Sequence, residues 1–441
     1  MKIDRRTLLR QALATSAAAF AAADTDAAAL PAPQTCGIDH IVVVTMENRS
    51  FDHLLGWVWT ADGRQRGLVY PDRLGTSRET HRLAPDFKGC GHPDPSHTWE
   101  GGRTQYNGGR MDGFLLSEPN DVYAIGYYGM FDRPFCSGLA ANYTTADRYF
   151  CSILGPTFPN RIFQHAAQTD RIDNSAFLST LPTIWDRLRD AGVSRRYYFS
   201  NLPFLALWGL AHLSIAATFD QFLADAAAGT LPAVSFVEPR FTLGDGVFSN
   251  DDHPHADVRA GDAFLSQVFH ALAGGPGWPG TVLVVTYDEW GGFFDHVPPP
   301  RVVAPNAVDP DLVGGRALLG FRVPVVVASP FTRGFPFVPR VSHTRFDHTS
   351  VLKLIEWRWG LPPLTARDAS FDVGNLASVL RFGSPDFTVP RLPRPLPPLP
   401  RSCGAASVAS RERTEPGAWE ALRSSGLLDG WPAVSEVEGL P

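Results

Sequence analysis

The most regular pattern in the chain is a set of short, unbroken apolar runs that lie far apart. Residues 38–46, 281–287 and 323–329 are rich in valine and isoleucine, and a shorter run covers 233–237. Such runs are typical of strands buried on both faces of a parallel sheet. Helical patterns cover 183–191, 204–217, 219–228, 256–273 and 348–359. This alternation predicts an α/β fold, with a mostly parallel central sheet and helices on both faces.

Other segments lack this periodicity. Residues 58–135 are rich in glycine, proline, aspartate and aromatic residues, and we expect a long ordered excursion over one edge of the sheet. Residues 384–400 are dense in proline and must be extended. Beyond them we expect one short helix around 418–428. The predicted organisation is a catalytic domain over 31–385, followed by a proline-rich and peripheral tail over 386–441.

Residues 1–30 have the pattern of an export signal. Arg5-Arg6 is a twin-arginine pair, and an alanine-rich run from Leu13 to Ala23 follows it. We therefore expect a secreted or periplasmic protein, exported by the twin-arginine machinery; a membrane anchor is the alternative reading of this run. No later run reaches eighteen apolar residues, so no transmembrane helix is expected in the mature chain.

Charge and cysteine content narrow the function further. The chain of 441 residues has a formal net charge of -6 and 19% charged residues, which gives no reason to expect nucleic-acid binding. Its five cysteines leave at least one unpaired, and no C-x-x-C pair exists to build a thiolate zinc site. Disulfides remain open, and buried free thiols are expected for most of the five, namely Cys36, Cys90, Cys136, Cys151 and Cys403.

Acidic and amide side chains follow two of the predicted strands directly. Glu47 and Asn48 come after the first strand, and Asp288 and Glu289 come after the run at 281–287. Ligands of parallel sheets collect beyond the carboxyl ends of the strands, so both pairs should lie on one rim. Oxygen ligands favour calcium, manganese or magnesium, while zinc or iron with histidines stays open. The alternative is that these residues only cap helices.

The segment Thr157-Phe158-Pro159-Asn160-Arg161 lies where a loop is expected to lead into a helix. A threonine hydroxyl is a poor nucleophile unless a metal or a base removes its proton. The free N–H groups of a helix N-terminus favour anions. The combination suits a covalent acceptor of a phosphoryl group, with Asn160 and Arg161 as candidates for substrate binding.

Three histidines are candidates for proton transfer or phosphate contact. His253 lies among acids and before a proline, so a protonated ring would be stabilised and held for donation to a leaving oxygen. His296 lies on a loop that is able to return over the rim, and His97 lies in the long excursion. Read alone, each of these segments is also consistent with an ordinary solvated turn.

Taken together, these motifs resemble the bacterial phosphoesterase family. The matching segments cover roughly residues 36–385 in order: DHIVVVTMENRSFDHLLG, GPTFPNR, DDHP, TYDEWGGFFDHVPPP, FRVPVVVASPF and FDHTSVLKLIEWRWG. That family includes secreted phospholipases C, plant non-specific phospholipases C and a periplasmic acid phosphatase, and its fold is similar to alkaline phosphatase. The T-x-P-x-R pattern at Thr157 is similar to the C-x-P-x-R of sulfatases. Threonine in place of the modifiable cysteine favours phosphate esters.

The resemblance also implies roles for individual residues. Thr157 matches the metal-bound nucleophile, and His253 matches the histidine that contacts the phosphoryl group and protonates the leaving oxygen. His97 and His296 fall near other phosphate-contacting positions. The implied metal ligands are Glu47, Asn48, Thr157, Asp288 and Glu289.

The predicted function is an exported, metal-dependent phosphoric-ester hydrolase. The leading substrate is a glycerophospholipid, cleaved as by a phospholipase C through a phosphothreonine intermediate, with transient contact to a membrane surface. An acid phosphatase acting on monoesters is the first alternative. A non-catalytic anion-binding protein, a sulfatase and a phosphonate hydrolase are further ones. Only about forty residues follow the proline-dense stretch, so we expect none of the extra domains that follow the catalytic domain of long phospholipases, and no substrate behaviour that depends on them.

Overall fold

The computed structural model describes residues 30–243, 246–334, 338–403 and 417–433. The predicted export signal at 1–30 therefore lies almost wholly outside the described residues. Within the described residues, no helix combines the length and the apolar character needed to cross a membrane.

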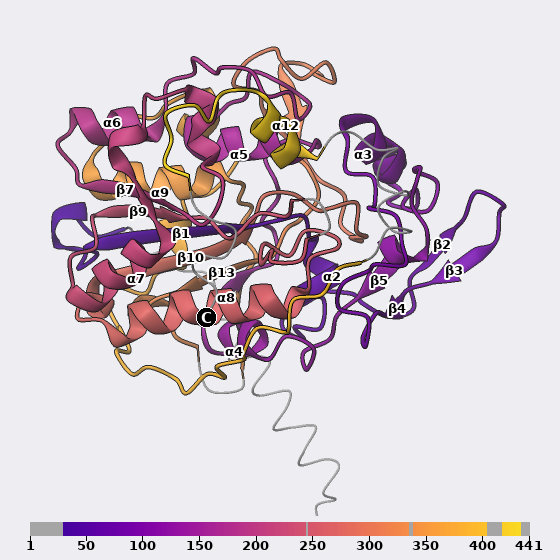
Figure 1. The fold of residues 1–441 in the computed structure, drawn as a ribbon, viewed down its shortest axis with the longest axis horizontal. Helices are drawn as coiled ribbons and strands as arrows, with labels where there is room; N and C mark the ends of the chain where they lie inside the picture. The colour runs from indigo at the N-terminus through magenta and orange to yellow at the C-terminus, as the bar shows by residue number, and fades with distance from the viewer. Residues whose placement is uncertain (1–29, 244–245, 335–337, 404–416, 434–441) are drawn as a thin grey trace, which may run out of the picture.

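An eight-stranded sheet forms the centre of the molecule (Figure 1), with the order β14-β6-β13-β10-β1-β9-β7-β8. Its middle strands are parallel, and β1 pairs with β10 in a register that runs from His40 with Thr281 to Met46 with Tyr287. The strands are β1 (His40–Met46), β6 (Thr144–Ala146), β7 (Arg195–Phe199), β8 (Ala216–Thr218), β9 (Val234–Val237), β10 (Thr281–Tyr287), β13 (Val325–Ala328) and β14 (Arg340–Ser342). The predicted α/β class with a mostly parallel sheet is confirmed.

The direction of one strand differs from the prediction. The apolar run at 323–329 predicts a buried strand of a parallel sheet, yet β13 is antiparallel to both β10 and β6. All four residues of β13 are buried, as those of β10 are. Composition therefore reports the burial of a strand and not its direction.

Helices cover both faces of the sheet, with α5, α6 and α9 above it and α4, α7 and α8 below it in Figure 1. The predicted helix over 204–217 is wrong. That segment forms two short 3₁₀ turns separated at Gly209, whose φ of 60° and ψ of -133° are not helical, and β8 begins at Ala216. The helices are α4 (Pro134–Asn142), α5 (Thr157–Ala166), α6 (Ile184–Asp190), α7 (Phe219–Ala228), α8 (Val258–Gly274) and α9 (Thr349–Trp359).

The excursion over 58–135 forms a lobe of short elements at one end of the sheet (Figure 1). It contains β2 (Val69–Pro71), β3 (Ser77–Glu79), β4 (His81–Arg82), α3 (Trp99–Tyr106), η2 (Asn107–Gly109), η3 (Val122–Ile125) and β5 (Gly126–Tyr127). The remaining elements are η1 (Pro33–Thr35), α2 (Phe51–Leu55), η4 (Phe204–Trp208), η5 (Leu213–Ile215), η6 (Trp278–Gly280), β11 (Arg301–Val303), β12 (Arg316–Leu318), η7 (Pro330–Thr332), α10 (Ala366–Ala369), η8 (Leu376–Val379) and α12 (Ala418–Ser424).

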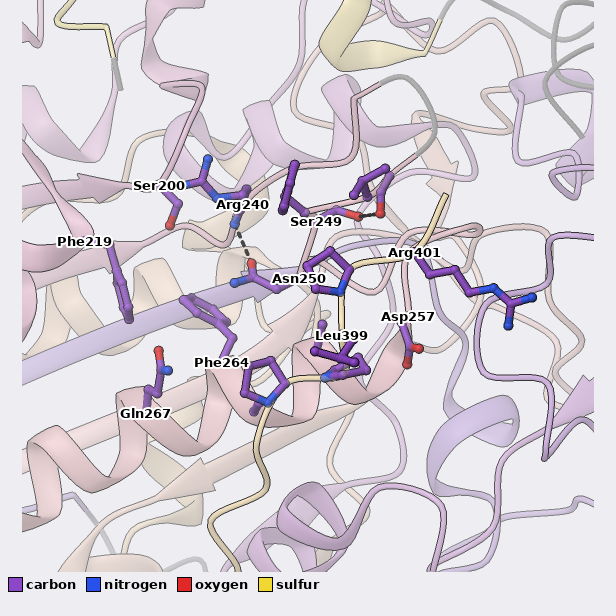
Figure 2. A pocket seen from close by; sticks show the side chains of 18 of the residues that line it. Ser200, Phe219, Arg240, Ser249, Asn250, Asp257, Phe264, Gln267, Leu399 and Arg401 are labelled. Carbon is purple, nitrogen blue, oxygen red and sulfur yellow. Dashed lines mark hydrogen bonds between the residues drawn. The ribbon is translucent and has the colours of Figure 1, made fainter. Parts of the chain in front are cut away.

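The proline-rich segment is free of helix and strand from 385 to 403, as expected. It passes over α8 and walls a cavity of about 320 Å³, in which Leu399 lies with Phe219, Phe264 and Asn250 (Figure 2). The segment ends at a disulfide between Cys403 and Cys90 of the excursion. The other three cysteines, Cys36, Cys136 and Cys151, are free.

The short helix expected near 418–428 is present as α12, but it is not peripheral. Trp419 is 2% exposed and Leu422 is fully buried, and α12 lies close to α5 in Figure 1. The two side chains are three residues apart and therefore share one face of the helix. That face is packed into the molecule.

Candidate active site

The pairing of β1 with β10 brings both acidic clusters to one rim of the sheet. The Asp288 N–H donates to the Met46 carbonyl at 3.0 Å, and the Asn48 N–H donates to Oδ1 of Asp288 at 3.0 Å. Asp288 Oδ1 also accepts from the N–H of Glu289 at 2.7 Å. Glu47 and these three residues are fully buried. The expected meeting of two distant sequence clusters is present in the structure.

Two glycines after Glu289 make this rim compact. Gly291 has a φ of +62°, and a Cβ atom there would lie 1.9 Å from the backbone oxygen of Asn48. Gly292 has a φ of +72°, and its Cβ atom would meet Pro95 at 2.6 Å. These glycines therefore let backbone approach backbone, so that the loop after β10 packs against Asn48 and the excursion.

Thr157 is the first residue of α5, as the sequence predicts, and it is 1% exposed. Its hydroxyl lies 3.5 Å from Oδ1 of Asn48, to which it donates. The preceding loop is held by Asn160, whose amide donates to the carbonyls of Ile153, Gly155 and Pro156. Asn160 thus fixes the loop that carries Thr157, and its amide is not available to a substrate as the sequence interpretation supposed.

Arg161 lies one helical turn after Thr157 and points toward the same rim. Its Nε donates to Glu47 Oε1 at 3.0 Å and to Asp288 Oδ2 at 3.1 Å, and Nη1 donates to Glu238 Oε2 at 2.7 Å. Burial alone would lower the pKa of this guanidinium, but the three carboxylates raise it above its ordinary value. Arg161 is fully buried. It therefore ties acidic side chains together, which corrects the prediction that it binds substrate.

The rim holds more buried acid than Arg161 can neutralise. Burial, and then the charge of Asp288, raises the pKa of both Glu47 and Glu289 well above the usual carboxyl range. Oε1 of Glu289 is buried and accepts no hydrogen bond. Excess negative charge and an orphaned carboxylate oxygen fit a divalent cation, which prefers oxygen ligands. The oxygen ligands predicted from the sequence are those of Glu47, Asn48, Thr157, Asp288 and Glu289, and this set stays a prediction. Among the described residues, the carboxylate and imidazole groups whose ligand atoms all lie within 4.8 Å of one another are two others, Asp94 with His97 and His253, and Asp52 with Asp295 and His296.

His97 reaches this rim from the excursion. Its Nδ1 lies 2.8 Å from the carbonyl of Pro95, which assigns the proton to Nδ1, because a carbonyl only accepts. Its Nε2 then accepts from the Asn48 amide nitrogen at 3.3 Å. This hydrogen bond turns the amide oxygen of Asn48 toward Thr157. His97 therefore orients a residue that contacts the nucleophile.

His253 lies beside His97, with 5.9 Å between the ring centroids. Its Nδ1 is 2.9 Å from the Pro254 carbonyl, and its Nε2 is 3.8 Å from Oδ2 of Asp94. The ligand atoms of Asp94, His97 and His253 all lie within 4.8 Å of one another. Asp94 is thus an acidic side chain that faces Nε2 of His253. The sequence gives no signal for this position of Asp94, because Asp94 is one of several acidic residues in an irregular segment.

His296 belongs to a different cluster. Its Nδ1 is 2.5 Å from Asp52 Oδ2, and its Nε2 is 3.0 Å from Asp62 Oδ1. Burial would lower the pKa of His296, but the hydrogen bond and charge of Asp52 raise it. Arg322 is fully buried and forms ion pairs with Asp52 and Asp295, so its positive charge offsets part of the negative charge of this cluster. His296 is therefore part of an ion-pair network, and its assignment to the catalytic group stays a prediction.

Two further residues touch the rim and were not predicted. Glu238 follows β9 directly and binds Arg161, so it repeats the pattern of Glu47 after β1 and Asp288 after β10. Position after a strand would have identified it. Trp419 of α12 donates its indole N–H to Oε2 of Glu47 at 2.8 Å. No sequence pattern connects these two positions. The cavity of Figure 2 is lined by other residues and is a separate feature.

Comparisons with known proteins show the family of this chain. The model of the Phosphoesterase family matches residues 38–362. Phospholipase C B of Mycobacterium tuberculosis is 33% identical over 461 residues, covering 86% of this chain and 85% of its own. Non-specific phospholipase C6 of Arabidopsis thaliana is 33% identical over 376 residues, covering 75% and 70%.

Solved structures are more distant. The phosphonate monoester hydrolase of Agrobacterium radiobacter aligns with a TM-score of 0.38 and 12% identity, over 79% of this chain and 78% of its own. A protein in the alkaline phosphatase superfamily from Vibrio parahaemolyticus aligns with a TM-score of 0.32 over 53% and 61%, with 11% identity. The family match and the sequence relatives are sufficient: the chain belongs to the Phosphoesterase family and is a hydrolase that acts on phosphoric ester bonds.

Proposed function

We propose that this protein is a metal-dependent phospholipase C, which releases diacylglycerol from a glycerophospholipid through a phosphothreonine intermediate. The observation that carries this proposal is the contact between the Thr157 hydroxyl and Asn48, at the rim where Glu47 and Asp288 meet. A hydroxyl at a helix N-terminus beside buried carboxylates is suited to accept a phosphoryl group. The names of the relatives, phospholipase C in bacteria and plants, support the lipid substrate.

A divalent cation held by the rim residues would lower the pKa of a bound hydroxyl and offset the charge of the phosphate. The oxygen-only donor set favours calcium, manganese or magnesium. Asn48, whose amide is oriented by His97, keeps the Thr157 oxygen pointed at the phosphate position.

In the first step, the Thr157 oxygen loses its proton to solvent and forms a bond to phosphorus. The bond from phosphorus to the diacylglycerol oxygen breaks, and His253 gives the proton of its Nε2 to that oxygen. In the second step, water attacks phosphorus and the bond to Thr157 breaks. Neutral His253 takes a proton from the water, and Thr157 regains its own from solvent. His253 is thus protonated before the first step, neutral between the two steps and protonated again after the second. Oδ2 of Asp94 lies 3.8 Å from the nitrogen that carries this proton.

Two exposed aromatic side chains of the excursion favour contact with a lipid surface. Trp59 is 70% exposed and Phe131 is 83% exposed, which is unusual for side chains of this size. Aromatic side chains of this kind favour the boundary between water and lipid. We propose that they make a transient contact with the membrane. The twin-arginine pattern at Arg5 and Arg6 supports export by that route, to the periplasm or the medium.

The substrate class is tested by assaying the purified enzyme on phosphatidylcholine and on p-nitrophenyl phosphate, with Thr157→Ala as the blank. We expect diacylglycerol release from the lipid that far exceeds the blank. Turnover of the monoester without diacylglycerol release would reject the phospholipase and support an acid phosphatase.

A further inference from the structure

The C-terminal segment supplies an unexpected contact to the proposed cation site. Trp419 lies 372 positions after Glu47, and its indole nitrogen donates to Oε2 of that carboxylate at 2.8 Å. Oε1 of the same carboxylate accepts from Arg161. Nη2 of Arg161 also lies 2.8 Å from Oε1. Both oxygens of Glu47 are therefore held in place by donors, and Oε2, which accepts from Trp419, keeps a second lone pair for a cation.

Packing on several sides fixes the position of the Trp419 ring, and with it the hydrogen bond to Glu47. Its ring stacks on Phe241, with 3.4 Å between centroids and 13° between planes, and it meets Phe158 edge-on at 5.9 Å. The guanidinium carbon of Arg161 lies 5.3 Å from its ring centroid. Phe158 is the residue after Thr157, so Trp419 contacts the neighbours of the nucleophile as well as a candidate ligand.

The path of the chain keeps this segment at the site. The proline-rich segment lines one side of the cavity of Figure 2 and ends at the disulfide between Cys403 and Cys90. Cys90 belongs to the same excursion as Asp94 and His97, so the tail is covalently joined to a segment that forms the rim. Farther along, Trp431 is buried and donates its indole N–H to the Gly209 carbonyl at 3.1 Å. The segment that bears Trp419 is thus held after it by Trp431.

We propose that Trp419 is a positioning residue, which orients the Glu47 carboxylate for the cation through its indole N–H. The inference rests on the proposed cation site. An indole nitrogen donates and never accepts, and it carries no charge that would compete with the cation. Outer partners that orient a metal ligand typically contribute 10- to 100-fold in metal affinity or activity.

Trp419→Phe tests this role, because it removes the N–H and keeps an aromatic ring on Phe241. We expect the full-length, chelator-treated variant to bind Mn²⁺ or Ca²⁺ alone about 10-fold or more weakly than the unmodified protein, measured by titration calorimetry. Trp431→Phe is the matched control, since it removes an indole N–H from the same segment without touching Glu47. It should leave the dissociation constant within about twofold.

Three results would overturn the inference: equal affinity of Trp419→Phe and the unmodified protein, equal loss in both variants, or no binding of either ion by the unmodified protein. A fourth result, higher activity in Trp419→Phe, would also overturn the inference, because it would show that α12 obstructs the site. The first two results would refute only the role of Trp419, whereas the absence of ion binding by the unmodified protein would also refute the proposed metal dependence. An enzyme that hydrolyses phosphatidylcholine while Trp419→Phe binds metal normally would refute only the role of Trp419.

Discussion

Thr157→Ala should lower kcat on phosphatidylcholine by about 10³-fold or more while leaving the fold intact. The threonine hydroxyl is the atom that bonds to phosphorus, and no other hydroxyl contacts Asn48 in the hydrogen bonds of the described residues. Thr157→Ser keeps that oxygen at the start of α5 and should retain a measurable fraction of the rate. The measurement is diacylglycerol release at saturating lipid, with circular dichroism to confirm folding.

Thr183→Ala is the matched control for this variant. Thr183 is also a buried threonine at the start of a helix, and its hydroxyl accepts from the N–H of Asp186 at the N-terminus of α6. Loss of that cap should cost about 1 kcal/mol of stability and leave kcat within about twofold. If Thr157→Ala keeps a substantial part of the wild-type kcat, the covalent step is refuted.

Arg161→Met should cost about 3–5 kcal/mol in the free energy of unfolding, because it leaves buried carboxylates without their shared cation. Arg161 bonds to Glu47, Asp288 and Glu238, and all four side chains are buried. The measurement is urea unfolding in the presence of a chelator, so that a bound metal ion does not replace the lost charge. Arg189→Met is the control, because Arg189 makes only exposed ion pairs on α6 and should change stability by less than about 1 kcal/mol.

The same variant predicts a pH dependence. Burial raises the pKa of Glu238, and Arg161 is the group that opposes this rise. Without Arg161 the pKa of Glu238 rises further, so the folded state takes up a proton that the unfolded chain does not. Such a carboxyl favours the folded state at low pH, and its contribution is lost as the pH rises through the folded pKa. The loss of stability should therefore be larger at pH 8 than at pH 5. A loss below about 1 kcal/mol at both pH values would contradict the account of Arg161.

Sequence reasoning found the parts of the site that follow from the sheet. Residues directly after parallel strands share one rim, which is why Glu47 and Asp288 were placed together across 241 positions. Glu238 follows β9 by the same rule and was overlooked because its strand is short. The direction of β13 was not predictable, since a fully buried strand has the same composition in either direction.

The other features of the site depend on contacts between loops and helices that are far apart in the sequence. The position of His296 in a loop did not reveal that its partners are Asp52 and Asp62. The sequence predicts that Arg161 binds substrate, whereas its position on α5 directs its side chain to three carboxylates. Trp419 is separated from Glu47 by most of the chain, and nothing in the predicted short helix around it indicates a contact with that residue. Tertiary packing alone decides such contacts.

The stereochemistry at phosphorus tests the covalent mechanism most directly. A phospholipid whose phosphorus is made chiral with sulfur would be hydrolysed in heavy-oxygen water, and the configuration of the released head-group thiophosphate would be determined. Each in-line displacement inverts phosphorus, so attack by Thr157 followed by attack by water predicts overall retention. Inversion would show that water attacks the lipid directly, and would contradict a phosphothreonine intermediate.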